Sequence, residues 1–178
     1  MAEPRTLILM RHATAGHPGS HRDHDRPLTP AGTRAAAAAG AWLRSTLPPV
    51  DAVLCSTSVR TRQTLAAAGI DAPAGFTDEL YGGGNADILE QLTALPDSAR
   101  TVLVIGHAPG IPSTAYELAT LAAGGGTGDG GVAAEPNPIH DELRHFSAGA
   151  LAVLTTRGSW ATLAETGARL TTVRHPDG

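Results

Sequence analysis

Short apolar runs alternate along the chain with longer segments in which apolar residues recur at helical spacing. A short aliphatic run closed off by polar or turn residues is typical of a buried strand, whereas apolar positions three and four apart are typical of a helix. Strands are therefore expected at residues 6–10, 51–55, 73–76, 101–105, 149–155 and 159–165, with a last edge strand at 169–173. Helices are expected at residues 29–46, 56–68, 86–95 and 113–123, and a loop is expected at 78–84.

Capping residues and prolines limit these helices. Thr29 caps the first helix with Pro30 at its first position, and the prolines at 48–49 end it. Residues 124–138 read GGGTGDGGVAAEPNP, a composition typical of a flexible loop. The sequence shows no internal repeat and no domain boundary, so residues 1–178 are expected to form a single domain.

The order of the elements predicts the fold class. Strands that alternate with helices are typical of an α/β fold, in which a mainly parallel sheet is covered by helices on both faces. Ligands of such folds bind beyond the carboxyl ends of the strands. The residues that follow each expected strand are therefore the candidates for a functional site.

Two histidines, two arginines and an acid follow the expected strands. They are Arg11, His12, Arg60, His107 and Glu79. This set suits phosphoryl transfer, because a neutral imidazole can attack phosphorus and form a phosphohistidine intermediate. Arginines and a second, protonated histidine would neutralise the charge on the phosphoryl oxygens. A carboxylic acid would protonate the leaving oxygen and then act as base for the attacking water.

The composition narrows the range of partners. All 13 residues counted as lysine plus arginine are arginine, so any anion must be held by arginine, histidine or backbone N–H groups. The net charge of -4 argues against a nucleic-acid partner. The single cysteine, Cys55, excludes a disulfide within the chain. With no signal-peptide start and no apolar stretch of about 20 residues, we expect a soluble cytoplasmic protein without a membrane partner, and a monomer by default.

Four ordered blocks resemble the histidine phosphatase superfamily, the phosphoglycerate mutase-like proteins. They are residues 9–13 (LMRHA), similar to the Arg-His-Gly signature after the first strand; residues 26–32 (RPLTPAG), similar to the stretch that opens the first helix; residues 56–64 (STSVRTRQT), similar to the Ser-Pro-x-x-Arg-Ala-x-Gln-Thr element; and residues 104–109 (VIGHAP), similar to the segment of the second catalytic histidine. Ala13 stands where glycine is usual, a change shared by many members of the SixA-like branch.

The resemblance implies a three-layer α/β/α sandwich that uses no metal or organic cofactor. It implies that His12 is the nucleophile and that Arg11, Arg60 and His107 hold the phosphoryl group. The SixA-like branch implies a metal-independent phosphatase acting on a phosphohistidine protein, and similar domains act on small phosphomonoesters. The alternative is a non-catalytic phosphoryl-binding module of the same fold. A mutase is disfavoured, since the short chain lacks room for the inserts that exclude water.

The proton donor is open between two carboxylic acids. Glu79 resembles the acid of the Glu-x-x-Tyr-Gly element in the mutase branch, with one residue fewer before the tyrosine, and Asp23 is its rival. Arg26 and Asp23, with Ala108 beside the second histidine, are expected to contact the substrate. The segment 17–25 holds several histidines and aspartates, but its loose spacing favours a polar rim around an anion rather than a metal site.

Overall fold

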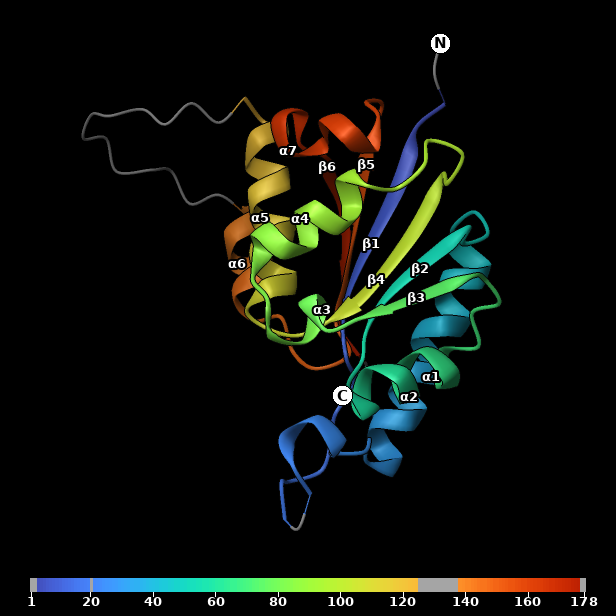
Figure 1. Cartoon of the computed structure of the whole chain (residues 1–178). Helices are drawn as coiled ribbons and strands as arrows, with labels where there is room; N and C mark the ends of the chain where they lie inside the picture. Colours follow the sequence, from blue (N-terminus) through green and yellow to red (C-terminus); the bar gives the residue numbers. More distant parts are fainter. Residues whose placement is uncertain (1–2, 20, 125–137, 177–178) are drawn as a thin grey trace, which may run out of the picture.

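Six strands form one sheet in the order β3-β2-β4-β1-β5-β6 (Figure 1). The structure is a computed structural model that describes residues 3–19, 21–124 and 138–176, with side chains described from residue 141 onward in the last range. The strands are β1 (Arg5–Arg11), β2 (Ala52–Ser56), β3 (Ala74–Thr77), β4 (Thr101–Gly106), β5 (Leu151–Thr156) and β6 (Arg169–Arg174). Strands β1 to β4 are mutually parallel and β5 runs antiparallel to β1, so the sheet is mainly parallel, as expected.

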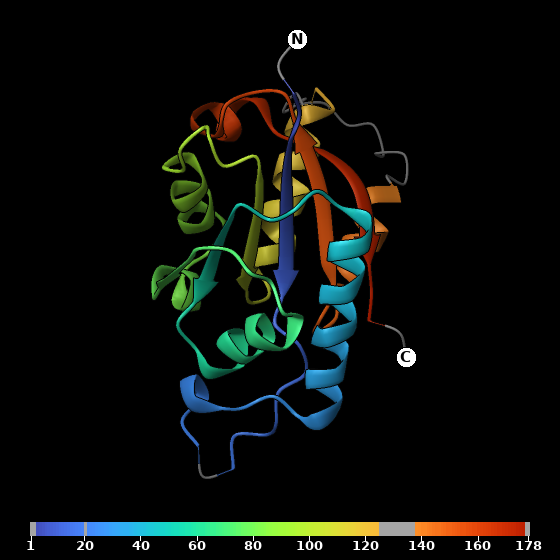
Figure 2. The same cartoon turned by 90° about the vertical axis from the view of Figure 1, so that its right-hand side faces the viewer.

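Helices cover both faces of this sheet. They are α1 (Pro30–Thr46), α2 (Val59–Ala68), α3 (Glu79–Gly82), α4 (Asn85–Thr93), α5 (Gly110–Ala122), α6 (Pro138–Arg144) and α7 (Leu163–Thr166), with short 3-10 turns η1 (Asp23–Asp25) and η2 (Trp160–Thr162). Helices α1 and α2 lie on one face, which is turned toward the viewer in Figure 2, and α4 to α7 lie on the other (Figure 1). The three-layer α/β/α sandwich is thereby confirmed.

The central strand β1 contributes side chains to two hydrophobic cores, one on each face of the sheet. Leu7 and Leu9 pack into the core beneath α4 and α5, whereas Ile8 and Met10 pack into the core beneath α1. Alternate residues of a strand point to opposite faces, and a strand buried on both faces reads as a continuous apolar run. Cys55 lies in the second core with no exposed surface.

Helix α1 begins and packs as its sequence indicates. Thr29 caps it by accepting a hydrogen bond from the backbone N–H of Gly32 at 3.0 Å. Gly40 lets α1 approach α2 closely, because a Cβ placed at residue 40 would lie 1.8 Å from the carbonyl oxygen of Ala68. A side chain at this position is therefore excluded by backbone atoms, which have little room to move.

The strand register brings distant segments to one edge of the sheet. Arg11 pairs with Gly106 across β1 and β4, and Cys55 pairs with Ile105 across β2 and β4. The carboxyl ends of these three strands therefore lie side by side. The residues that follow them start at neighbouring points of the same edge.

Three expectations about elements were wrong. Residues 159–165 do not form a strand but the turn η2 followed by α7, because Trp160 and Leu163, three apart, are both buried in one core. The expected loop at 78–84 contains the single helical turn α3. Helix α5 begins at Gly110 rather than at residue 113, since its proline at 112 lies in the first turn, where a missing N–H costs no hydrogen bond.

Two further expectations concern the second half and the membrane. The flexible loop predicted at 124–138 lies outside the described residues except at its ends, and its last residue begins α6. Within the described part of the chain, no helix is both long and apolar enough to cross a bilayer.

Candidate active site

His12 directly follows β1 and faces the histidine that follows β4. Its backbone N–H donates to the carbonyl of Gly106 at 3.0 Å, which continues the pairing of the two strands by one residue. The ring centroids of His12 and His107 are 5.1 Å apart. The parallel pairing of β1 and β4 thus places both predicted histidines at one point of the sheet edge.

The hydrogen bonds of His12 define which ring nitrogen is unprotonated. Nδ1 lies 2.7 Å from the carbonyl oxygen of Ala13, and since a carbonyl only accepts, Nδ1 carries the proton. Nε2 therefore has a lone pair, toward which Nε of Arg60 points at 3.3 Å. Burial, helped by the charges of Arg60 and Arg11, lowers the pKa of His12 to about 4. The imidazole is thus neutral at neutral pH, as a nucleophile must be.

Arg60 is held in the first turn of α2 at the centre of this arrangement. Ser58 precedes the helix as its cap, and Arg60 is only 5% exposed. Besides His12, its guanidinium reaches Nδ1 of His107 at 3.3 Å and the backbone carbonyl and carboxylate of Asp23 at 2.6 and 3.2 Å. A buried cation at a helix N-terminus is electrostatically unfavourable unless an anion lies beside it.

His107 is arranged as a second neutral imidazole. Its Nδ1 accepts from Arg60, so Nε2 carries the proton and donates to Oγ of Ser56 at 2.9 Å. Burial, followed by the charges of His12 and Arg60, lowers the pKa of His107 to about 3. The protonated state expected for this residue is therefore disfavoured before an anion binds. A bound phosphoryl group would raise the pKa, because a negative charge favours the protonated ring.

Asp23 is the acid that the structure brings to the two histidines. Its carboxylate pairs with Arg60 at 3.2 Å and with Arg26 at 2.9 Å, and it accepts a hydrogen bond from the hydroxyl of Tyr81 at 2.8 Å. The Tyr81 hydrogen bond, together with Arg60 and Arg26, lowers the pKa of Asp23 to about 2. Asp23 is therefore ionised in the free enzyme.

These groups line a cavity of about 450 Å³. Its lining residues are Arg11, His12, Asp23, Arg26, Arg60, Tyr81, Gly82, His107 and Ala108. All predicted site residues except one are in this set, although their roles stay predictions. Arg11 is fixed in the wall by a hydrogen bond of 2.9 Å from its Nη1 to the carbonyl of Phe146. The side chain of Asp23 is 55% exposed, so the cavity opens to solvent at this side.

Glu79 does not line the cavity. Its side chain is exposed and accepts a hydrogen bond from the hydroxyl of Thr77, at the end of β3. Because Glu79 begins the short helix α3, the residue that this turn presents to the cavity is Tyr81. The structure thus separates the two candidate acids and brings only Asp23 to the histidines.

Tyr81 is the site residue that the sequence analysis did not single out. Its ring contacts the imidazoles of His24 and His107 edge-on, with centroids 4.8 and 5.6 Å apart, and the guanidinium of Arg60 lies 5.8 Å from the ring centroid. The available signal was the Tyr-Gly pair within the element that pointed to Glu79. That signal indicated the correct segment, but the side chain that reaches the cavity is Tyr81 and not Glu79.

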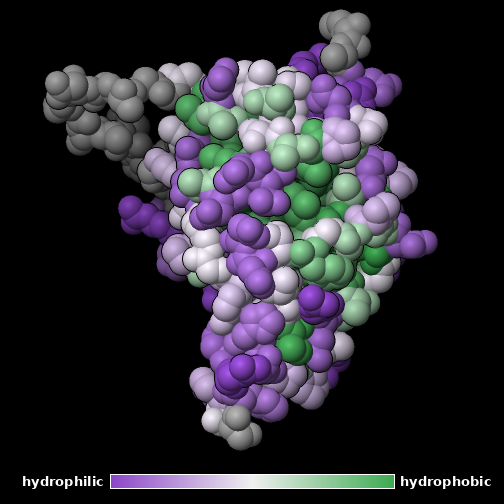
Figure 3. All heavy atoms as spheres, viewed as in Figure 1, coloured by the Kyte–Doolittle hydropathy of each residue, from purple (hydrophilic) through white to green (hydrophobic). Residues whose placement is uncertain are grey.

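The loop that carries Asp23 leads from β1 to α1 at the end of the molecule beside the cavity. This end is predominantly hydrophilic (Figure 3). Its charged side chains pair with one another, as Arg22 does with Asp25 at 2.9 Å. Among residues 3–19, 21–124 and 138–176 there is no group of three or more histidine, cysteine or acidic side chains with the arrangement to hold a metal ion.

The chain matches known proteins over most of its length. The model of the histidine phosphatase superfamily (branch 1) matches residues 7–81. The uncharacterized protein Rv1276c of Mycobacterium tuberculosis (strain H37Rv) is 44% identical over 152 residues, which are 85% of this chain and 90% of that protein.

Solved structures extend the match to the whole fold. A protein assigned as the phosphohistidine phosphatase SixA of Nakamurella multipartitia is 56% identical, with 99% of each chain covered and a TM-score of 0.88. A second, assigned as SixA of Agrobacterium tumefaciens, is 26% identical, covers 98% of this chain and 100% of its own, and has a TM-score of 0.74. The chain therefore belongs to the histidine phosphatase superfamily, as a phosphatase of its SixA-like branch.

Proposed function

We propose that this phosphatase works without a metal ion, through a phosphohistidine intermediate on His12, and that its substrate is a phosphohistidine side chain of a protein. The observation that carries the mechanism is the unprotonated Nε2 of a buried, neutral His12 that lines the cavity, where this nitrogen accepts a hydrogen bond from Arg60. The substrate class is supported by likeness to proteins assigned as SixA phosphohistidine phosphatases and by the state of Asp23.

The first step transfers the phosphoryl group to the enzyme. Nε2 of His12 forms a bond to phosphorus as the bond from phosphorus to the leaving group breaks. Arg11, Arg60 and His107 would surround the phosphoryl oxygens and stabilise their charge, with His107 taking up a proton as the anion binds. In the second step water attacks phosphorus, the bond to Nε2 breaks, and inorganic phosphate leaves with His12 neutral again.

The ionised state of Asp23 bears on the leaving group. An alkoxide leaving group must receive a proton, which a carboxylate cannot supply. A phosphohistidine substrate can carry a proton on its second ring nitrogen, so that cleavage of its P–N bond releases a neutral imidazole without an external acid. A site whose nearby acid, Asp23, is ionised before substrate binds therefore suits a phosphohistidine better than an alkyl phosphate.

The test combines activity with trapping of the intermediate. The native chain, His12→Ala and the matched control His17→Ala would each be given a ³²P-labelled phosphohistidine protein and para-nitrophenyl phosphate in EDTA. His17 is exposed and outside the cavity, which makes it a suitable control. We expect His12→Ala to lose at least about a thousandfold in kcat, with the control unchanged.

A rapid quench should also show acid-labile, base-stable phosphate on the native protein and none on His12→Ala. Equal activity of His12→Ala and native protein would remove His12 from the mechanism. Loss of activity in EDTA that added zinc restores would contradict the metal-free reaction. Efficient turnover of phosphoserine peptides, with none of phosphohistidine, would overturn the proposed substrate while leaving the mechanism in place.

A further inference from the structure

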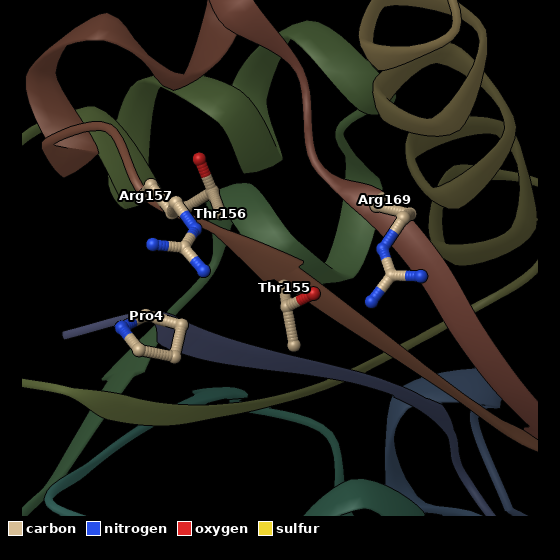
Figure 4. Close-up of a pocket in the computed structure, with 5 residues that line it drawn as sticks. All are labelled: Pro4, Thr155, Thr156, Arg157 and Arg169. Atoms are coloured by element: carbon tan, nitrogen blue, oxygen red, sulfur yellow. The ribbon is translucent and has the colours of Figure 1, made fainter.

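A second cavity lies at the opposite end of the sheet from His12. It has a volume of about 370 Å³ and is lined by Pro4, Thr155, Thr156, Arg157 and Arg169 (Figure 4). Thr156 pairs with Arg5, the first residue of β1, whereas His12 follows the last. The seven residues of β1 therefore separate the two cavities by about 20 Å, at about 3.3 Å per residue.

One arginine of this cavity lies on β6 and the other directly follows β5. Arg169 is the cross-strand partner of Thr155 in the β5–β6 pair, and directly paired residues point to the same face. Arg157 follows Thr155 by two residues. Figure 4 shows the two guanidinium groups on either side of Thr155, with its hydroxyl between them. Donor groups from two strands thus face one hollow.

The turn that carries Arg157 is fixed from within the protein. Arg5, which is only 6% exposed, donates from Nη1 to the carbonyl of Gly158 at 2.7 Å and forms an ion pair with Asp97 at 2.9 Å. The backbone N–H of Gly158 donates to the hydroxyl of Thr156 at 3.2 Å. The backbone beneath Arg157 is therefore held in place, and less conformational freedom is lost when a ligand binds.

Neither guanidinium of this cavity has a partner for its charge among the described residues. Within that part of the chain neither the Arg157 side chain nor the Arg169 side chain takes part in a hydrogen bond or ion pair, and no acidic residue lines the cavity. Some other arginines are paired with carboxylates, as Arg5 is with Asp97 and Arg100 is with Glu3. In a chain of net charge -4, two unpaired guanidinium groups at one cavity are a concentrated positive site.

We infer that this cavity binds a phosphate group, free or attached to a small molecule, separately from the catalytic site. Two guanidinium groups match the charge of a phosphate dianion, and their planar forks suit its oxygens. The hydroxyl of Thr155 adds a third donor. The inference does not depend on the proposed function, because none of its residues lies in the active-site cavity.

The test is a titration of the full chain with inorganic phosphate, followed residue by residue in ¹H–¹⁵N NMR spectra. We expect saturable shifts of the amides of Thr155, Arg157 and Arg169, distinct from any shifts at His12 and at the second histidine. The double variant Arg157→Ala/Arg169→Ala should weaken this binding at least tenfold. The matched control Arg34→Ala, an exposed arginine of α1, should bind phosphate as the native chain does.

Three outcomes would overturn the inference: absence of shifts at these amides, equal shifts with chloride at the same ionic strength, and unchanged binding by the double variant. Phenylphosphonate, which has no hydrolysable P–O bond to its ring, distinguishes the two sources. Tighter binding than phosphate supports a small molecule that carries the group, and equal or weaker binding supports free phosphate. The double variant should keep native phosphatase activity, so failure here and failure of the proposed function are distinguishable.

Discussion

At the scale of single residues, each histidine of the site donates from one ring nitrogen and keeps the other ring nitrogen unprotonated. The carbonyl of Ala13 takes the proton-bearing nitrogen of His12, and Ser56 takes that of His107. Both remaining nitrogens face Arg60. Arg60 therefore contacts both imidazole rings. A phosphoryl group that binds beside these rings would replace contacts that Arg60 now makes to Asp23.

This replacement predicts different roles for the two candidate acids. A phosphoryl group that takes Arg60 from Asp23 and adds negative charge beside it raises the pKa of Asp23, so the acid becomes available only in the complex. We expect Asp23→Asn to lower kcat about a hundredfold on an alkyl phosphate and much less on phosphohistidine. Glu79→Gln should stay within about twofold of native activity on both, as a residue outside the cavity.

Steady-state kinetics on the two substrates check this expectation. The pair is matched, since each substitution replaces a carboxylate with its amide. If Glu79→Gln were the more damaging change, proton donation would have to involve a movement of α3. If Asp23→Asn affected both substrates equally, the carboxylate would act on phosphoryl binding rather than on the leaving group.

At the scale of elements, helices α1 and α2 approach each other closely. This approach depends on Gly40, where a Cβ would lie 1.8 Å from the carbonyl oxygen of Ala68. In an unconstrained helix Gly→Ala stabilises by up to about 1 kcal/mol. Here we expect Gly40→Ala to lower the free energy of unfolding by at least about 2 kcal/mol, because the helices must separate.

Urea unfolding of Gly40→Ala measures this effect. The control is Gly84→Ala, since a Cβ at residue 84 meets nothing within 4 Å, and its effect should stay within about 0.5 kcal/mol. Because α2 carries Arg60, phosphatase activity of the folded Gly40→Ala variant should also fall. A stabilised Gly40→Ala variant would show that the two helices separate without loss.

The elements that repeat a simple pattern could be predicted from the sequence, and so could the residues at their ends. Buried runs such as β1 and β4, and a capped helix such as α1, have a single periodicity and clear limits. The strand predicted at residues 159–165 was wrong because a short apolar segment fits the period of a strand as well as that of a helix. The burial of Trp160 and Leu163 in one core, which the sequence does not show, distinguishes the two.

The acid side of the site could not be predicted for a similar reason. Glu79 follows the end of β3 by two residues, whereas Asp23 lies twelve residues beyond the end of β1, so position in the chain favoured Glu79. Which carboxylate enters the cavity depends on the single helical turn α3, which lacks a capping side chain and gives no sequence signal. The histidines and Arg60 were accessible to prediction, because each follows a long buried strand directly or begins a capped helix.

At the scale of the whole molecule, the buried neutral His12 lowers the free energy of unfolding in mild acid. The pKa of His12 is about 4 in the folded chain, below its ordinary value of 6.5. Between these values the unfolded chain binds more protons, so the free energy of unfolding falls as the pH drops from 6.5 toward 4 and is restored above 6.5. From pH 6.5 to 5, His12 alone accounts for at most about 2 kcal/mol.

Urea unfolding at pH 7 and pH 5 tests this linkage. We expect native protein to lose stability between the two values, and His12→Asn to lose less, with His17→Asn behaving as native. Asp23 does not contribute in this window, because its pKa is lowered to about 2 and its effect is lost only below pH 3.8. An unchanged pH dependence in His12→Asn would show that His12 is not neutral in the folded protein.

The pairing of β1 also has a consequence for the making of the protein. Leu9 pairs with Val104 on one side and with Ala152 on the other, so the strand that precedes His12 is synthesised long before either neighbour. The surroundings of His12 are therefore complete only after residues 151–156 have been made. A nascent chain that ends before β5 leaves an apolar edge of β1 open to pairing with other chains. Catalytic competence therefore requires β5, and we expect chains that end before it to be inactive and prone to aggregate.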